Sequence, residues 1–293
     1  MRKAVALLLL CCYALVAHAG SLESGVQDNS PRSFILKKHT KPRLRSSIAL
    51  IYDVNSKRPL YAKNDDDIVP IASISKLMMA MVVLDARLPM DQEITITRAD
   101  KDHLKYSHSR MRPGTTLTRR ELLKLALMAS ENRAAAALAR TYPGGTKAAV
   151  AMMNFKAHQL GMDDTHFLDP TGLNSGNVST AQDLVKMVLA AKHYAPIRKF
   201  TTTASHQVEI DGRRRPLHYV NTNPLVHSDY WDIGLSKTGY ISEAGRCLVM
   251  EATIKDRPVV IVLLDSWGKR TRIGDANRVR HWMESALVPT TRG

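Results

Sequence analysis

The segment from Pro70 to Leu84 constrains the fold most, because a helix breaker is followed at once by a run with the composition of a buried helix. Pro70 closes a polar loop, and the apolar residues after it predict a helix that starts near Ala72. Ser73 and Lys76 then lie in the first turn, at a spacing that places both side chains on one helical face. A serine hydroxyl needs a base to become a nucleophile, and a lysine can serve if it is held neutral. Burial or a second nearby cation would lower the pKa of Lys76 and make this possible.

A Ser-x-x-Lys spacing is common by chance, so this pair alone also fits an N-capping serine beside a solvated lysine. Two later triplets bear on the choice. Ser130-Glu131-Asn132 lies at the junction of two predicted helices, where it could instead cap a helix. Lys237-Thr238-Gly239 ends an apolar run among predicted strands, and its glycine would let a substrate backbone approach closely. The three segments together predict a site that no single one establishes.

Composition and the first residues predict an exported globular protein. The 293 residues are 44% hydrophobic and 24% charged, as in folded domains. Residues 1–19 have the pattern of a cleaved secretory signal, with Arg2 and Lys3 before an apolar run and Ala17-His18-Ala19 as a small-x-small cleavage site. The apolar run is short for a membrane span, so we expect no stable membrane anchor. The mature chain would keep only Cys247, which we expect to be buried in a strand.

The net charge of +15 indicates an anionic partner. In an exported protein this favours an anionic envelope polymer or a lipid surface, and we expect no nucleic acid as partner. The histidines are scattered, and His103 and His108, on a helix-like stretch, do not match a zinc motif. We therefore expect no metal and no cofactor.

Strands are predicted near both ends of the chain, with helices between them. Residues 20–44 read as a flexible basic arm. A strand hairpin follows over residues 47–62, and later strands are expected over 233–238, 247–255 and 259–264, before a last helix over 272–286. Helices are predicted over 120–129, 132–141 and 180–192. This order predicts an α/β (α+β) fold with one sheet built from distant segments and a helical lobe, about residues 89–227, inserted in it.

The three segments match the S-x-x-K, S-D-N and K-T-G signature of β-lactamases and penicillin-binding proteins, with Glu131 in place of the aspartate. Similar stretches surround them, including Pro170-Thr171-Gly172-Leu173 and Ser242-Glu243-Ala244-Gly245. Over about residues 45–287 the chain resembles the low-molecular-mass penicillin-binding proteins, which are serine D-alanyl-D-alanine peptidases. Within them it is most similar to D-alanyl-D-alanine endopeptidases of the penicillin-binding protein 7 type. Residues 288–293 would then be a short tail.

This resemblance implies a β-lactamase-like fold, in which helices flank an antiparallel five-stranded sheet and the inserted lobe is all-helical. It implies that Ser73 attacks the carbonyl of a D-alanine and forms an acyl-enzyme, with Lys76 as its base. It further implies that Ser130 relays a proton to the leaving amine and that Lys237 is the second cation beside Lys76. The remaining implied roles are substrate amide binding by Asn132, carboxylate binding by Lys237 and Thr238, and an oxyanion hole from the backbone N–H groups of Ser73 and Tyr240, beside Gly239.

The implied function is a periplasmic endopeptidase that cleaves D-alanyl cross-links of peptidoglycan in cell wall remodelling and is inhibited by β-lactams. A carboxypeptidase is the nearest alternative, because removal of a terminal D-alanine starts with the same attack. The absence of a further domain or amphipathic anchor after Gly239 favours the endopeptidase. A β-lactamase is a weaker alternative, because the only glutamate between Asn132 and Lys237 is Glu209. A non-catalytic wall-binding module would leave the three motifs unexplained.

Overall fold

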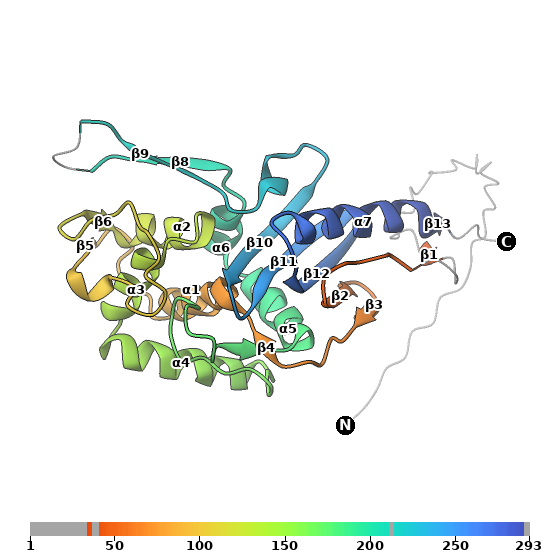
Figure 1. Ribbon diagram of the computed structural model, residues 1–293, viewed down its shortest axis with the longest axis horizontal. Helices are drawn as coiled ribbons and strands as arrows, with labels where there is room; N and C mark the ends of the chain where they lie inside the picture. Colours follow the sequence, from red (N-terminus) through yellow and green to blue (C-terminus); the bar gives the residue numbers. More distant parts are fainter. Residues whose placement is uncertain (1–33, 37–40, 211–213, 290–293) are drawn as a thin grey trace, which may run out of the picture.

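The computed structural model describes residues 34–36, 41–210 and 214–289, and its centre is a five-stranded antiparallel sheet (Figure 1). The strand order is β10-β11-β12-β2-β3, so segments from both ends of the chain lie side by side, as predicted. The predicted signal peptide lies outside the described residues. The strands are β2 (Ile48–Asp53), β3 (Arg58–Lys63), β10 (Asp232–Ile241), β11 (Gly245–Ile254) and β12 (Arg257–Ser266).

Helices cover both faces of the sheet, and alternate side chains along each strand enter two separate cores. In β2, Ala49 and Ile51 pack toward α7 (Thr271–Ala286) in one core. Ile48 and Leu50 belong to the other core, which includes α5 (Ala181–Ala191). A side-chain hydroxyl caps α5, because Thr180 Oγ1 accepts from the Asp183 backbone N–H at 3.1 Å. Because every central strand is buried on both faces, the sheet is a rigid support for residues at its edge.

The helical lobe is built around α1 (Lys76–Asp85), whose residues 76–83 are all buried. A helix that is apolar all round can only sit inside a core, as the sequence predicted. Helix α5 packs against α1, as do four further helices: α2 (Arg119–Met128), α3 (Asn132–Arg140), α4 (Gly145–Gln159) and α6 (Ala195–Thr201). The start of α1 therefore lies at the boundary between lobe and sheet, next to strand β10.

The lobe is predominantly helical but also contains short strand pairs, so it is not all-helical. One ribbon joins β5 (Glu93–Thr95) to β6 (Thr116–Thr118), and another joins β8 (Ser205–Val208) to β9 (Leu217–Val220) and projects from the lobe (Figure 1). A third pair, β4 (Val69–Pro70) with β7 (Val178–Ser179), lies just before the start of α1. Strands of two to four residues give too short a pattern to be recognised in the sequence.

Part of the predicted flexible arm is in a strand. Residues Phe34–Leu36 form β1, which pairs antiparallel with β13 (Leu287–Pro289) at the end of the chain. The predicted arm therefore includes a short paired strand, which the composition of the whole segment did not indicate because its backbone partner lies far away in the sequence. The short tail over residues 288–293 stays a prediction. No helix among the described residues is long and apolar enough to cross a membrane.

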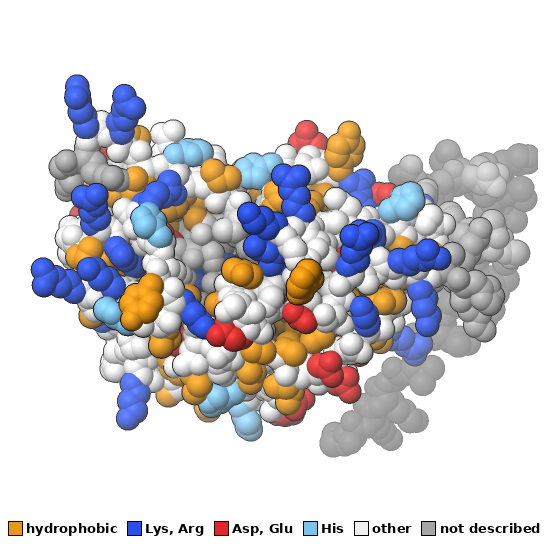
Figure 2. Space-filling view, viewed as in Figure 1, with side chains coloured by type: hydrophobic (Ala, Val, Ile, Leu, Met, Phe, Trp, Pro, Cys, Tyr) orange, Lys and Arg blue, Asp and Glu red, His pale blue; other side chains and the backbone are white. Residues whose placement is uncertain are grey.

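Basic side chains predominate on the face shown in Figure 2, over both the lobe and the sheet. This agrees with the net charge of +15. An anionic ligand approaching this face would be attracted.

Candidate active site

Ser73 and Lys76 lie in one tight turn at the start of the buried helix. A 3-10 helix, η1 (Ala72–Ser75), precedes α1, so the predicted helix start near Ala72 is confirmed with a tighter first turn. Side chains three residues apart eclipse one another in 3-10 geometry. Lys76 Nζ lies 2.7 Å from Ser73 Oγ. Ala72, directly before the serine, has a φ of +49°, a strained value for a residue with a Cβ.

The surroundings of Lys76 suit a neutral amine. Its Nζ also lies 2.6 Å from the Thr171 carbonyl oxygen and 2.8 Å from Asn132 Oδ1, and both of these atoms can only accept hydrogen bonds. A neutral amine has two N–H groups for these acceptors, and its lone pair is left facing the Ser73 hydroxyl. The arrangement can therefore accept the proton of Ser73.

Burial also lowers the proton affinity of this amine. Lys76 has no exposed surface, and desolvation lowers its pKa to about 8, although the carboxylates of Asp169, Glu131 and Asp102 act in the opposite direction. The sequence analysis expected Lys237, as a second cation, to lower the pKa of Lys76. In the structure burial lowers the pKa of Lys76. The pKa of Lys237 itself is lowered well below its ordinary value by desolvation and by the charge of Lys76.

Ser130 forms a second serine–lysine pair. It lies between α2 and α3, with a φ of +58°, and Lys237 Nζ donates to its Oγ at 2.9 Å. Lys237 also donates to the Thr238 carbonyl oxygen at 2.8 Å and is 1% exposed. Both lysines thus lie behind a serine that faces the cavity. The adjacent Glu131 is the N-cap of α3. Within this triplet Glu131 therefore caps the helix, and Ser130 and Asn132 line the cavity.

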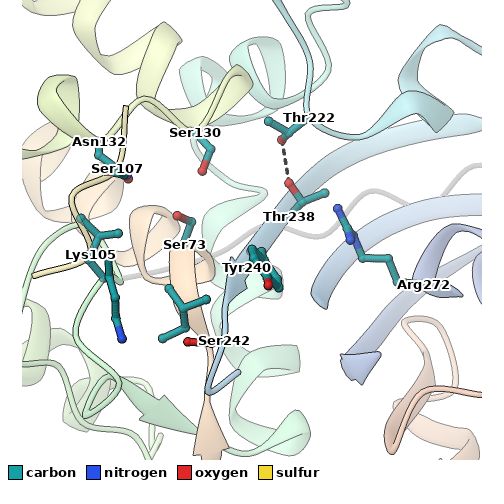
Figure 3. Close-up of a pocket in the computed structure, with 13 residues that line it drawn as sticks. Ser73, Lys105, Ser107, Ser130, Asn132, Thr222, Thr238, Tyr240, Ser242 and Arg272 are labelled. Carbon is teal, nitrogen blue, oxygen red and sulfur yellow. Dashed lines mark hydrogen bonds between the residues drawn. The ribbon is translucent and has the colours of Figure 1, made fainter. Parts of the chain in front are cut away.

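A cavity of about 640 Å³ separates the lobe from the edge of the sheet (Figure 3). Ser73 and Ser130 face it from one side, and Thr238 and Tyr240 face it from strand β10. The structure therefore brings the site residues predicted from the sequence together at this cavity. Lys76 and Lys237 contact Ser73 and Ser130, which line the cavity, but do not line it themselves. The described residues that line it are Ser73, Lys105, Ser107, Ser130, Asn132, Leu173, Thr222, Thr238, Gly239, Tyr240, Ile241, Ser242 and Arg272.

Gly239 is needed for packing against the serine turn. A Cβ at this position would lie 2.9 Å from the Ile71 carbonyl oxygen and 3.1 Å from the Ser73 backbone nitrogen. The close approach expected for a substrate backbone is thus made by η1. This contact sets the distance between strand β10 and the Ser73 backbone N–H.

Arg272 is a site residue that the sequence analysis missed. It lines the cavity from the first turn of α7, and it is 8% exposed. Its Nε and Nη1 atoms have no hydrogen-bond partner among the described residues, and desolvation and nearby Arg246 lower its pKa. A cation in the first turn opposes the helix dipole, and this mismatch is the signal that could have identified it. A buried guanidinium facing a cavity can bind a carboxylate.

Three other contributions were missed because they depend on tertiary contacts. The Thr171 carbonyl oxygen accepts from Lys76, and Thr222 Oγ1 lies 2.7 Å from Thr238 Oγ1 (Figure 3). Ser107 accepts from Asn132 Nδ2 at 2.8 Å. A backbone carbonyl or a lone hydroxyl carries no signal in sequence.

Nothing in the described part of the chain gathers three or more His, Cys, Asp or Glu side chains in a way that could hold a metal ion. His103 and His108 are exposed, and their segment is a loop where a helix-like stretch was expected. Cys247 is buried as predicted, and desolvation raises its pKa to about 12.

Comparisons with known proteins identify the family of this chain. The Peptidase S11 family, described as D-alanyl-D-alanine carboxypeptidase, matches residues 36–268. A D-alanyl-D-alanine endopeptidase of Escherichia coli (strain K12) is 46% identical over 249 residues, which is 85% of this chain and 80% of the relative. One from Pseudomonas aeruginosa is 47% identical over 245 residues, 84% of this chain and 79% of the relative.

A solved structure gives the same result for the fold. The Streptomyces K15 DD-transpeptidase superposes with a TM-score of 0.77 at 30% identity, covering 84% of this chain and 99% of the other. The fold, the paired serines and lysines, and these similarities lead to one assignment: the chain belongs to the S11 peptidase family of D-alanyl-D-alanine carboxypeptidases.

Proposed function

We propose that this chain is a serine D-alanyl-D-alanine endopeptidase that cleaves peptidoglycan cross-links through an acyl-enzyme on Ser73. The observation that supports this best is the buried amine of Lys76, 2.7 Å from Ser73 Oγ, with its N–H groups directed at two fixed acceptors. Its pKa of about 8 leaves about a tenth of the amine neutral at pH 7, far more than for a solvated lysine.

In the proposed first step, Lys76 Nζ takes the proton of Ser73 while the serine oxygen bonds to the D-alanine carbonyl carbon. The backbone N–H of Ser73, with that of Tyr240, would stabilise the oxyanion. As the C–N bond breaks, Ser130, oriented by Lys237, would relay the proton held by Lys76 to the nitrogen of the leaving amine. Water hydrolyses the acyl-enzyme and restores the serine.

Substrate binding is proposed for the polar groups around the serines. Asn132 would donate to an amide carbonyl of the substrate, and Thr238 would donate to its carboxylate. Arg272 adds a buried cation on the same side of the cavity as Thr238 (Figure 3). Lys237 Nζ donates to Ser130 and to the Thr238 carbonyl oxygen, so we assign it to orienting Ser130. A charged Lys237 has a third N–H, and direct binding of the substrate carboxylate by it stays a prediction.

Similarity favours the endopeptidase over the carboxypeptidase. The relatives named endopeptidases in Escherichia coli and Pseudomonas aeruginosa are 46% and 47% identical, whereas a carboxypeptidase of Bacillus subtilis is 31% identical. The test is to incubate the purified protein with cross-linked muropeptide dimers. We expect monomers to form and the Ser73→Ala variant to form none. Release of free D-alanine without monomers would instead establish the carboxypeptidase.

β-Lactams should acylate Ser73 and remain bound. None of the described residues that line the cavity is an aspartate or glutamate that could activate water, and Glu209 is exposed beyond β8. Intact mass spectrometry after penicillin treatment should show one stable adduct, absent in Ser73→Ala. Rapid turnover of penicillin would establish a β-lactamase.

Export to the periplasm and action on the wall complete the proposal. The basic face and the net charge of +15 would attract an anionic wall polymer. A Ser73→Ala variant that binds wall material but does not cleave it would separate binding from catalysis. Binding with no hydrolysis by the unmodified protein would indicate a wall-binding module.

A further inference from the structure

Ser107 lies on a loop that is fixed beside the cavity. One carboxylate organises this loop: Asp102 accepts from the backbone N–H groups of Leu104 at 2.8 Å, Lys105 at 3.0 Å and Ser107 at 2.8 Å. Lys105 also forms an ion pair with Glu243, in the turn after strand β10. The loop is therefore held from both the lobe and the sheet.

The hydrogen bonds of Asn132 determine which way its amide faces. Lys76 Nζ can only donate to Asn132, so Oδ1 must be the atom that accepts at 2.8 Å. Nδ2 then faces Ser107 and donates to its Oγ at 2.8 Å. One N–H of the amide is satisfied in this way, and the other remains for the cavity that Asn132 lines.

The position of Ser107 is fixed through its backbone, because its N–H donates to Asp102 Oδ2 at 2.8 Å. Burial raises the pKa of the Asp102 carboxyl, but the hydrogen bonds that it accepts from the loop bring that pKa below its ordinary value, so Asp102 remains a charged acceptor. With its backbone held in this way, Ser107 Oγ presents a lone pair to Asn132 Nδ2. Asp102 thus holds the residue that accepts from Asn132, and Asn132 in turn accepts from Lys76.

We propose that Ser107 is a positioning residue that aims the free N–H of Asn132 at an amide carbonyl on the acyl side of the substrate. This rests on the proposed function, because the ligand is the peptide group preceding the bond that is cut. Without Ser107, the Asn132 side chain keeps its bond to Lys76 but loses the contact that fixes the plane of its amide. Ligands without that peptide group gain nothing from the alignment.

Two penicillins test this role. Benzylpenicillin has a side-chain amide, and 6-aminopenicillanic acid has a free amine in its place. The rate constant for acylation of Ser73 by each is measured by mass spectrometry for the unmodified protein and for Ser107→Ala. We expect the variant to react about tenfold more slowly with benzylpenicillin, the loss of one oriented hydrogen bond, and less than about threefold more slowly with 6-aminopenicillanic acid.

Three further variants complete the experiment. Ser107→Thr keeps the hydroxyl and should restore most of the rate. Ser109→Ala, on the same loop but bonded to Met111, should react with both compounds at nearly the unmodified rate. In an Asn132→Ala background, Ser107→Ala should cause no further selective loss.

The outcomes separate the two proposals. If the unmodified protein is not acylated by either compound, the proposed function and the role of Ser107 both fail. If it is acylated and Ser107→Ala slows both compounds equally, or neither, only the role of Ser107 fails.

Discussion

Burial of Lys76, the proposed general base, lowers the stability of the fold. A fully buried amine with three polar neighbours stabilises less than an apolar side chain of similar volume would, because the charged form is desolvated. The same desolvation brings its pKa to about 8. The position is therefore best explained by its reaction with Ser73.

The pH dependence of acylation should report this pKa. Protonated Lys76 has no lone pair, so the acylation rate should rise about tenfold per pH unit below pH 8 and level off above it. The measurement is penicillin acylation between pH 6 and pH 10. Lys76→Arg, which stays protonated over this range, should be acylated very slowly at every pH. A rate that is still rising at pH 10 would show that the burial of Lys76 does not set the profile.

Arg272 should contribute to binding and little to stability. Replacing it with Gln removes a buried cation that lacks partners for two of its nitrogens among the described residues, so the free energy of unfolding should not fall. The kcat/KM for a cross-linked muropeptide dimer should fall about 10- to 100-fold. The same dimer with the carboxylate next to the cleaved bond amidated is the control and should lose little. An equal loss for both dimers would exclude carboxylate binding.

The site residues that the sequence could predict are those whose side-chain chemistry is itself the signal. Ser73, Lys76, Ser130 and Lys237 combine nucleophile and amine at recognisable spacings. The Thr171 carbonyl could not be predicted, because every residue has a carbonyl and only the fold selects one. The position of Lys237 behind Ser130 is likewise a matter of side-chain direction, which spacing does not determine.

At the scale of elements, the loop around Gly172 fixes the turn that carries Ser73. Gly172 has a φ of +79°, and a Cβ there would lie 1.9 Å from the Ala72 carbonyl oxygen. The Thr171 carbonyl that accepts from Lys76 precedes it. The loop thus supports both the backbone and the base of the proposed nucleophile.

Gly172→Ala should therefore displace the serine turn. We expect a loss of at least about 2 kcal/mol in the free energy of unfolding and a large drop in the acylation rate of the folded protein. Gly114→Ala is a matched control, because Gly114 also has a positive φ, +93°, but no atom lies within 4 Å of its added Cβ. It should cost about 1 kcal/mol from backbone strain alone and leave acylation unchanged. Similar acylation by the two variants would contradict the steric argument.

The elements themselves were predictable where their patterns were long. The strands of the sheet and helices α2, α3, α5 and α7 lie within a few residues of their predicted ranges. Helix α4 was not predicted, because it begins at Gly145 and glycine disfavours helices. The preceding Gly144 is its N-cap, in a left-handed conformation. The segment around His103 was misjudged because Asp102 holds its backbone in turns.

At the scale of the whole molecule, one buried carboxylate joins the two ends of the fold. Asp275, in α7, accepts from the Arg45 and Ser46 backbone N–H groups at distances between 2.7 and 3.0 Å, and from Ser46 Oγ at 2.6 Å. These residues lie just before β2, which pairs with β12 on one side and with β3 on the other. The first and last parts of the domain can therefore only be ordered together.

Asp275→Asn should destabilise the whole domain. The amide keeps one acceptor oxygen but turns a donor toward groups that donate, and it removes the charge paired with Arg278, so we expect a loss of about 2–4 kcal/mol in the free energy of unfolding. Urea unfolding followed by circular dichroism measures this, with Asp163→Asn, an exposed aspartate, as the control within about 0.5 kcal/mol. Because Asp275 is absent from the described cavity lining, the folded fraction should still be acylated at the unmodified rate. A stable variant with slow acylation would instead mean that Asp275 acts on the site, through Arg272 one helical turn away.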